Sequence, residues 1–493
     1  MTPAIAPCRS PLAHTNGFTP RAGFRPFNPA DAESTLGARF RETALRRGNA
    51  IALVDGGARI SYADLLLRAE TIAATLRSRW GGAGGIVGIC LPSGLPTIEA
   101  MLGALAGGFG YFCADPSLPT AQIAGLLEAA APLTVLGDAP ADGKARGVRA
   151  ADTRGPGGTA AMYATSGSTG EPKIVALPHR AVLFDIGRQT NDLCLGPDDR
   201  FDSLFSSAFS ASLATVFGAL LNGAELHHHD PRHQLTGLFD WLAERRITIS
   251  TMTVSMLRHI CMARRSRPGC PSLRLLSVSG EALKAGDVEM FRSVFGASCV
   301  LQNAMASTET RTYAQYFVPG RGPVENPVPI GWPVAGKAVT VMDETGAPVP
   351  EGGEGEIVVR SRYIATSYAN DPRRTAEKFQ IQPDGTIRYR TGDRGRLRAD
   401  GSLVFLGRTD SQVKVRGHRV ELGAIAQAIE SHPAVRNAVV VRREDAGGHG
   451  RLVAYVAPRE DTDLTEGHLR GFLRERLPAY AVPAAFVFLP ELP

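Results

Sequence analysis

Apolar residues recur at helical spacing in the first third of the chain, and short continuous apolar runs separate these stretches. The segment 59–80, RISYADLLLRAETIAATLRSRW, has helical spacing and contains Ser61, a residue type that caps helices. The run 85–92, GIVGICLP, has the composition of a buried strand, and 97–116 predicts a small-residue helix leading into another strand. This alternation continues to about residue 315 and predicts a largely parallel sheet covered by helices.

The pattern changes after residue 323, where short strand-like segments and turn residues dominate. A compact strand–helix pattern then follows GRTD at 407–410, with helices expected at 420–433 and 464–478. We therefore divide the chain into an irregular lead-in at 1–35, a large core at 36–408 and a small domain at 409–493.

Composition narrows the function classes. Of the 493 residues, 44% are hydrophobic and 21% charged, as in globular proteins that bury a large core. No window approaches ~18 uninterrupted apolar residues, and the first residues lack a basic flank followed by an apolar core, so we expect neither a membrane helix nor a signal peptide. An odd number of cysteines without a CxxC motif favours a reducing cytoplasm. The net charge of +6 is dispersed along the chain, which favours a local basic surface for an acidic carrier protein over nucleic-acid binding.

The segment 165–173, TSGSTGEPK, has the composition of a phosphate-binding loop. Glycines let the backbone approach an anion, hydroxyl and N–H groups donate hydrogen bonds, and a lysine adds positive charge. A Gly/Ser/Thr loop alone is also compatible with a surface turn, but the Pro-Lys ending makes the string more specific. It is not a Walker loop, because GK[ST] is absent.

This string resembles the phosphate loop of the adenylate-forming superfamily, which includes acyl-CoA synthetases, luciferases and the adenylation domains of nonribosomal peptide synthetases. Other segments resemble the superfamily in the same order: 201–226, 275–283, 303–310, 353–379, 389–393 and 407–425. Together they cover about residues 35–493, and the segments 375–379 and 407–425 are most similar to peptide-synthetase adenylation domains. The resemblance implies an α/β fold in which βα-layered sheets and a distorted barrel form a large N-terminal domain, followed by a small mobile α+β C-terminal domain.

The resemblance also implies roles for individual residues in binding ATP. The loop residues Thr165, Ser166, Gly167, Ser168, Thr169, Gly170 and Lys173 would surround the β- and γ-phosphates. Asn303 would contact the adenine edge, Ala304 and Met305 would lie beside it, Thr308 would contact the α-phosphate and Glu309 would hold Mg²⁺. Asp393 would accept hydrogen bonds from the ribose, and Arg408 would reach the ribose or a phosphate. Lys173, Thr308, Glu309 and Arg408 are therefore the expected catalytic residues.

By the same resemblance, the small domain would rotate at Asp410 between two half-reactions. One arrangement would form the acyl adenylate, and the other would admit a pantetheine thiol past Gly417, where a side chain would obstruct close approach. The thiol would belong to a carrier protein. The resemblance places the acyl pocket at Phe209, Ser210, Ala211, Ala214, Thr251, Ser277, Ser279, Ala304, Thr312 and Tyr313.

Several positions depart from the superfamily pattern. Met305 replaces an aromatic residue, Ala306 a glycine, and Ile174 the glycine that usually follows the loop lysine. Ser210 stands where members that activate amino acids usually have an aspartate that pairs with the substrate ammonium. A buried ammonium without a counter-charge is costly, so this change favours a hydroxy, keto or simple acid, while an amino acid bound in another way stays open. The small hydroxyl-bearing lining favours a polar or compact acid over a long alkyl chain.

The sequence stops at FVFLPELP, before the segment in which the superfamily carries a further catalytic lysine. Loss of one such electrostatic contact would slow adenylation by ~10²–10³-fold, and we expect that the chain is cut at this boundary. The run His227-His228-His229 does not predict a metal site, because consecutive side chains on a strand face opposite sides. Two alternatives stay open: an acyl-CoA ligase that uses free coenzyme A, and a catalytically retired homologue that binds nucleotide.

Overall fold

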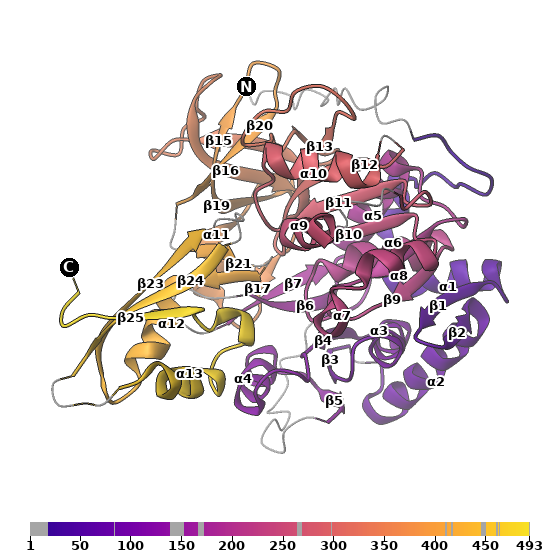
Figure 1. Cartoon of the computed structure of the whole chain (residues 1–493). Coiled ribbons are helices and arrows are strands. Elements are labelled where there is room, and N and C mark those ends of the chain that lie inside the picture. The colour runs from indigo at the N-terminus through magenta and orange to yellow at the C-terminus, as the bar shows by residue number, and fades with distance from the viewer. Residues whose placement is uncertain are drawn as a thin grey trace.

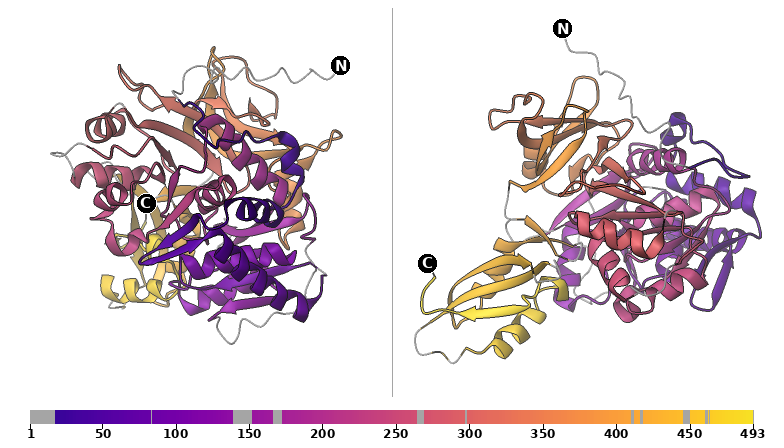
Figure 2. Two further views of the ribbon diagram at one scale, coloured as in Figure 1. Left: turned by 90° about the vertical axis from the view of Figure 1, so that its right-hand side faces the viewer. Right: turned by 45° about the horizontal axis from the view of Figure 1, so that its top comes forward.

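A computed structural model describes residues 18–82, 84–138, 152–165, 172–263, 269–296, 298–409, 412–415, 418–444, 450–459, 462 and 464–492. Figures 1 and 2 show that the chain from β21 onward forms a separate body beside the rest of the molecule, next to α4. The predicted α/β architecture, with a large N-terminal part and a smaller C-terminal part, is confirmed.

The described strands of the larger part form three sheets, of which the first has nine strands in the order β14-β13-β12-β11-β10-β8-β9-β1-β2. Its central strands pair in parallel from β1 through β9, β8, β10 and β11 to β12. The strands are β1 (Ile51–Asp55), β2 (Ala58–Ser61), β8 (Arg200–Ser203), β9 (Glu225–His228), β10 (Ile249–Thr253), β11 (Leu275–Ser279), β12 (Val300–Ser307), β13 (Arg311–Val318) and β14 (Trp332–Pro333).

Two further sheets complete the larger part, again counting described strands only. A six-stranded sheet has the order β17-β7-β6-β4-β3-β5, with β3 (Ile86–Cys90), β4 (Gly110–Cys113), β5 (Thr134–Gly137), β6 (Thr159–Thr165), β7 (Lys173–Pro178) and β17 (Ser367–Tyr368). A five-stranded antiparallel sheet contains β15 (Ala338–Met342), β16 (Glu354–Ser361), β18 (Phe379–Ile381), β19 (Ile387–Leu397) and β20 (Leu403–Arg408). The run predicted as a buried strand at 85–92 is β3, and all five of its residues are buried.

The C-terminal body contains the hairpin of β21 (Gln412–Val415) and β22 (His418–Glu421). In the part of this body that the structure describes, β23 (Val435–Glu444), β24 (Gly450–Pro458) and β25 (Ala485–Phe488) form a three-stranded sheet. The predicted helices at 420–433 and 464–478 are confirmed as α12 (Leu422–Glu430) and α13 (Glu466–Arg474). Both contribute to a hydrophobic core that belongs to this body alone.

The helices of the larger part follow local signals in the sequence. The predicted helix at 59–80 is α2 (Tyr62–Trp80), and Ser61 caps it by accepting a hydrogen bond from the Asp64 N–H at 3.0 Å. The other helices are η2 (Pro29–Glu33), α1 (Leu36–Arg47), α3 (Leu95–Gly107), α4 (Thr120–Ala130), α5 (His179–Leu193), α6 (Ser212–Asn222), α7 (Pro231–Gln234), α8 (Leu238–Glu244), α9 (Val254–Ala263), α10 (Ala285–Phe295) and α11 (Pro372–Lys378), with η3 (Ala479–Ala481) in the C-terminal body.

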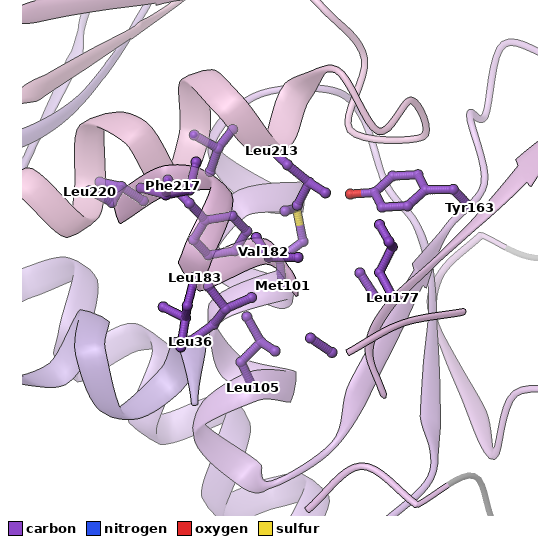
Figure 3. Close-up of a cluster of buried hydrophobic side chains, with 14 of the residues drawn as sticks. Leu36, Met101, Leu105, Tyr163, Leu177, Val182, Leu183, Leu213, Phe217 and Leu220 are labelled. Carbon is purple, nitrogen blue, oxygen red and sulfur yellow. The ribbon is translucent and has the colours of Figure 1, made fainter. Parts of the chain in front are cut away.

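The main core joins the nine-stranded and six-stranded sheets through buried helices. Figure 3 shows Met101 of α3, Val182 of α5 and Phe217 of α6 meeting in one cluster with Leu177 of β7. Helix α3 is apolar on nearly all sides because both faces are covered, as the small-residue segment at 97–116 predicts. This packing fixes α5 and α6 against the sheets and so determines which of their side chains reach the site described next. None of the helices that the structure describes is long and apolar enough to span a membrane.

Candidate active site

A cavity of about 1030 Å³ lies where the carboxyl ends of strands from both large sheets meet the C-terminal body. The carboxyl ends of parallel strands are the usual location of ligand sites in such sheets. The predicted residues that line it are Thr165, Phe209, Ser210, Ala211, Ala214, Thr251, Ser277, Ser279, Ala304, Thr308, Thr312, Asp393 and Arg408. The structure thus brings together side chains that come from positions more than 240 residues apart.

Strand alternation explains which predicted residues line the cavity. On β12, Gln302 and Ala304 face the cavity, whereas Asn303 and Met305 face the other side of the strand. Asn303 is buried there, and its Nδ2 donates to the carbonyl oxygen of Pro329 at 2.9 Å. Asn303 and Met305, expected beside adenine, are therefore on the strand face opposite Ala304, which was expected both beside adenine and in the acyl pocket.

The predicted phosphate loop connects two antiparallel strands, since Thr165 ends β6 and pairs with Lys173 at the start of β7. The predicted phosphate contacts of Ser166, Gly167, Ser168, Thr169 and Gly170 lie outside the described residues. Lys173 does not line the cavity; its Nζ lies 3.9 Å from the Glu421 carboxylate of the C-terminal body. Both side chains are largely buried, so this ion pair connects the two bodies beside the loop.

The turn after β12 carries Thr308 and Glu309. The hydroxyl groups of Ser210 and Thr308 are 2.9 Å apart, and Arg311 Nη1 donates to the Ser210 carbonyl oxygen at 2.8 Å. Glu309 is fully buried, and its Oε1 accepts a hydrogen bond from the Tyr368 hydroxyl at 3.2 Å. Glu309 therefore faces the molecule's interior, whereas Thr308 and Ser210 are on the cavity wall.

The residue types at this turn suit the Mg²⁺ that the resemblance implies, although Thr308 faces the cavity and Glu309 faces the interior in this structure. Glu309 offers carboxylate oxygen, and the hydroxyl of Thr308 precedes it on the adjacent residue, both hard ligands of the kind that Mg²⁺ prefers. No group of three or more His, Cys, Asp or Glu side chains that could hold a metal occurs among the described residues. An ion here would therefore depend on substrate phosphates and water for its remaining ligands, as is usual for Mg²⁺.

Asp393 and Arg408 form the second polar centre of the cavity. They pair across β19 and β20, and Arg408 Nη1 donates to Asp393 Oδ1 at 2.5 Å. Tyr313, which was expected in the acyl pocket, is fully buried and does not line the cavity; its hydroxyl donates to Asp393 Oδ2 at 3.2 Å. Burial and the charge of Asp393 raise the pKa of Tyr313 well above its usual value, so this hydroxyl stays a donor.

The predicted hinge Asp410 and the predicted tunnel residue Gly417 lie outside the described residues, whereas residues of β21 and β22 form one wall of the cavity. The His418 ring stacks on the Tyr480 ring, with centroids 3.9 Å apart, and meets the edge of Phe209 at 4.8 Å. His418 and Tyr480 were not among the residues predicted from the sequence, because their contacts depend on how the C-terminal body docks. The GHRVE stretch, with an aromatic residue next to Gly417, was the available signal.

The cavity also continues past the predicted acyl pocket. The space for the acid is therefore deeper than the small lining residues had indicated. Beyond Ala304 it reaches Gln302 of β12 and Arg188 and Gln189 of α5. These three residues were not among those predicted from the sequence. A signal was present in α5, where Asp185, Arg188, Gln189 and Asp192 follow at spacings of three and four among apolar residues, so that they share one helix face.

Comparison with known proteins gives a consistent result. The family described as AMP-binding enzyme matches residues 40–369, and the AMP-binding enzyme C-terminal domain matches residues 424–493. The chain is 34% identical over 499 residues to the Dimodular nonribosomal peptide synthase of Bacillus subtilis (strain 168), covering 93% of this chain and 21% of that protein. It is 33% identical over 482 residues to Bacitracin synthase 1 of Bacillus licheniformis, covering 93% of this chain and 9% of that protein. The chain thus spans about a fifth or less of the length of these relatives.

Among solved structures, the fold is similar to holo-PA1221, described as an NRPS protein containing adenylation and PCP domains bound to a vinylsulfonamide inhibitor. That likeness has a TM-score of 0.80 and 28% sequence identity, and it covers 94% of this chain and 82% of the other. The Vibrio cholerae adenylation domain AlmE, solved in complex with glycyl-adenosine-5'-phosphate, shares the fold with a TM-score of 0.79 at 20% identity, over 93% of this chain and 95% of that chain.

Proposed function

Because this chain belongs to the AMP-binding enzyme family, we propose that it joins a carboxylic acid to AMP at the expense of ATP, with release of pyrophosphate. We further propose that the acyl group then passes to the phosphopantetheine thiol of a carrier protein in nonribosomal peptide or related secondary-metabolite synthesis. The observation that carries the proposal is that one cavity is lined both by Thr308, Asp393 and Arg408, which the resemblance assigns to the nucleotide, and by residues such as Ser210 that it assigns to the acyl pocket.

The first half-reaction is attack of the acid carboxylate on the α-phosphate of ATP. In this proposal Thr308 donates to the α-phosphate, where negative charge accumulates, and the loop 165–173 holds the departing pyrophosphate. Asp393 accepts hydrogen bonds from the ribose hydroxyls while Arg408, already bound to Asp393, faces the phosphate side. Mg²⁺ held by Glu309 would offset charge on the triphosphate.

The second half-reaction is attack of a thiol on the acyl adenylate. The hairpin β21–β22 supports this role, because it lines the same cavity as the predicted acyl pocket, together with α4 and residues 476–481. In the same arrangement Glu421 pairs with Lys173, which would otherwise be available to the phosphates of ATP. We therefore propose that residues 409–493 move as a unit relative to 36–408, about Asp410, and that adenylation requires Lys173 to leave Glu421.

The acid itself is an amino acid or a hydroxy, keto or simple relative. The Ser210 hydroxyl is hydrogen-bonded with the Thr308 hydroxyl, and serine offers no negative charge to an ammonium group. The carboxylates on the cavity wall are Asp115, Glu128, Asp230, Asp393 and Glu421. Asp115 and Asp230 pair with Arg232, Asp393 with Arg408, and Glu421 with Lys173, so these four carboxylates already have a positively charged partner. A reducing location such as the cytoplasm is compatible with the described cysteines, which are buried and form no disulfide with one another.

The deciding experiment is ATP–pyrophosphate exchange with the full-length natural protein. Each amino acid is paired with its hydroxy and keto analogues, and a carrier protein and free coenzyme A are compared as acceptors. Exchange with at least one acid, followed by loading of the carrier protein, supports the proposal. Loading of coenzyme A alone supports the acyl-CoA ligase instead, and ATP binding without exchange supports a retired homologue.

A further inference from the structure

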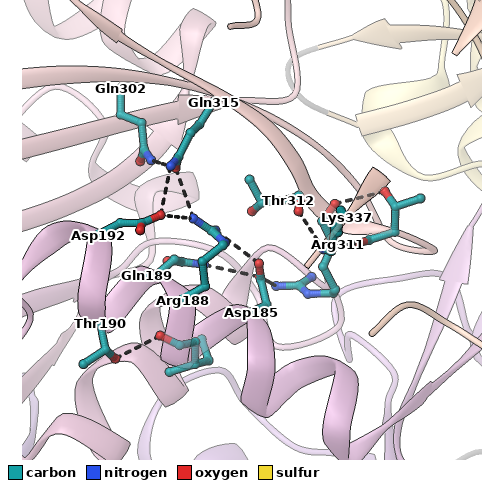
Figure 4. A network of polar contacts seen from close by, with 12 residues as sticks. Asp185, Arg188, Gln189, Thr190, Asp192, Gln302, Arg311, Thr312, Gln315 and Lys337 are labelled. Atoms are coloured by element: carbon teal, nitrogen blue, oxygen red, sulfur yellow. Dashed lines mark hydrogen bonds and ion pairs between the residues drawn. The ribbon is translucent and has the colours of Figure 1, made fainter. Parts of the chain in front are cut away.

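The deep end of the cavity borders a cluster of charged and amide side chains, which we call the arginine cluster (Figure 4). It consists of Asp185, Arg188 and Asp192 of α5, Gln302 of β12, Arg311 and Gln315 of β13, and Lys337. Of these, Arg188, Gln302 and Arg311 line the cavity, next to apolar side chains such as Phe201 and Leu275. Guanidinium groups thus face a cavity whose neighbouring wall is apolar.

The two arginines converge on one carboxylate from different elements. Arg188 Nη2 donates to Asp185 Oδ1 at 3.2 Å, and Arg311 Nη2 lies 3.6 Å from Asp185 Oδ2. Arg188 also donates to Asp192 at 2.8 Å and to Gln315 at 3.1 Å. Because both guanidinium groups contact Asp185, they are close enough to each other for a single further anion to meet both.

Arg188 and Arg311 each have one N–H donor without a hydrogen-bond acceptor among the described residues. Both side chains are about 95% buried, and among the described residues neither Nε–H has an acceptor. A buried donor without an acceptor is destabilising and is uncommon in native proteins. Both Nε atoms are covered by protein, so an anion in the cavity would meet these two arginines through their other guanidinium nitrogens, and its negative charge would offset part of the cost of the two buried donors.

The net charge of the arginine cluster indicates that the ligand is negatively charged. Arg188, Arg311 and Lys337 face Asp185 and Asp192, so the cluster carries one excess positive charge when Lys337 is protonated. Lys337 is buried, and its Nζ donates to the carbonyl oxygens of Thr310 and Thr312 at 2.6 Å each. Burial lowers its pKa to about 7; Asp185 opposes this change, and the two arginines add to it. An added anion would neutralise the excess charge and favour protonated Lys337.

We infer that the acid carries a second carboxylate, remote from the one that is activated, and that Arg188 and Arg311 bind this carboxylate at the deep end of the cavity. This inference rests on the proposed adenylation. Gln302 lies two residues, or ~7 Å, deeper along β12 than Ala304, whereas Arg311 also contacts the Ser210 carbonyl oxygen, so the cluster extends along the acyl pocket from Ser210 to Gln302. The substrate class is therefore a dicarboxylic acid, with or without an amine, whose far carboxylate is recognised through charged hydrogen bonds.

The first test varies the far end of the substrate with the wild-type chain. Acids of equal length that end in a carboxylate, a carboxamide or a methyl group are compared by kcat/KM in pyrophosphate exchange, over several chain lengths. Charged hydrogen bonds are about twice as strong as neutral ones, so we expect the carboxylate to exceed the amide by at least ~10-fold and the methyl compound by ~100-fold. Equal or better use of the methyl-ended or amide-ended acids would overturn the inference while leaving the proposed adenylation intact.

The second test changes the protein. Arg188→Gln and Arg311→Gln should each bring the carboxylate-to-amide preference close to one. The matched control is Arg258→Gln, because Arg258 is also buried and bound to a carboxylate, Asp287 at 2.6 and 2.9 Å, but does not line the cavity. General destabilisation lowers exchange with both acids and leaves their ratio unchanged, so only a loss of preference specific to the two cavity arginines supports the assignment. A preserved preference in both folded variants would refute it.

Calorimetry separates failure of the inference from failure of the proposed function. The same acids are titrated into the full chain at pH 8, in two buffers with different ionisation enthalpies. We expect tighter binding of the carboxylate-ended acid and uptake of a fraction of a proton, as Lys337 among Asp185, Arg188 and Arg311 becomes protonated. If no acid drives exchange but this preference appears, the binding site stands and adenylation fails. If binding shows no preference for the second carboxylate, the inference itself fails.

Discussion

Replacing Tyr313 with phenylalanine tests how the Asp393 carboxylate is held for the nucleotide. The change removes one hydroxyl from a fully buried ring and leaves the ring itself in place. Asp393 then loses the donor on Oδ2, 3.2 Å away, but keeps Arg408 on Oδ1. A hydrogen bond to a charged group contributes ~1.5–3 kcal/mol, and we expect the lower end because Arg408 still fixes the carboxylate.

A loss of about 1.5 kcal/mol in nucleotide positioning corresponds to a roughly tenfold weaker affinity. We therefore expect the KM for ATP in pyrophosphate exchange, and the Kd for ATP measured by calorimetry, to rise about tenfold in Y313F. The KM for the acid should change little, because Tyr313 does not line the acyl end of the cavity.

The control is Y316F, the same chemical change three residues further along β13, where the ring packs beside Trp332 with centroids 6.0 Å apart. This variant should bind ATP like the wild type. If Y313F and Y316F have the same affinity for ATP as the wild type, then the Tyr313 hydroxyl does not position Asp393 for the nucleotide. If Y313F instead raises the KM for the acid alone, Tyr313 belongs to the acyl pocket, as the sequence analysis expected.

Three further predictions concern the docked C-terminal body and the fold. His418→Ala removes aromatic contacts worth ~0.5–1.5 kcal/mol each and should slow acyl transfer ~5–10-fold in single-turnover assays while exchange changes less than ~2-fold; equal slowing of both steps would contradict it. Lys284 and Glu444 form an ion pair at 2.7 Å across the two bodies, and both side chains are 40% exposed. K284E should therefore alter acyl transfer less than ~5-fold, and the charge-reversed double variant K284E/E444K should restore it. A double variant no better than K284E alone would exclude the contact. Burial lowers the pKa of His179 from 6.5 to about 4, so the folded chain favours the neutral ring. The free energy of unfolding should therefore fall by ~3 kcal/mol as pH drops from 6.5 to 4. The urea midpoints of H179Q should lack this part of the decline, and an unchanged pH dependence in H179Q would refute the assignment.

Local patterns in the sequence predicted the elements that depend on neighbouring residues. Helix α2 needs only its apolar spacing and the Ser61 cap, and β3 needs only a short apolar run between glycines and Pro92. Most residues that line the acyl pocket could also be predicted. The resemblance located β12, and the alternation of side chains along a strand decides which of its residues share one face. The same alternation separates Ala304 from Asn303 and Met305, although the sequence alone did not indicate that the two groups would lie on opposite sides of one strand.

Contacts between residues distant in sequence could not be predicted in this way. Arg188 and Gln315 are 127 positions apart, and Tyr313 and Asp393 are 80 positions apart. Their pairing depends on how α5 and the five-stranded sheet pack against β13, which no local pattern encodes. Tyr313 illustrates the limit: resemblance assigned both Thr312 and Tyr313 to the acyl pocket, but adjacent residues on a strand face opposite sides, and only Thr312 lines the cavity.

The arginine cluster also connects the acid to the catalytic turn. Arg311 has a φ of +56°, a left-handed conformation that costs ~1–2 kcal/mol for a residue with a side chain. Its guanidinium group and Lys337 compensate for this cost, since Arg311 binds the Ser210 carbonyl oxygen and Lys337 binds the carbonyl oxygens of Thr310 and Thr312 on either side. The turn that presents Thr308 to the nucleotide is therefore held by charges of the same cluster that we infer to bind the acid. An acid whose far carboxylate binds this cluster would strengthen the support of the turn. Binding of the far carboxylate and placement of Thr308 for the nucleotide would therefore occur together.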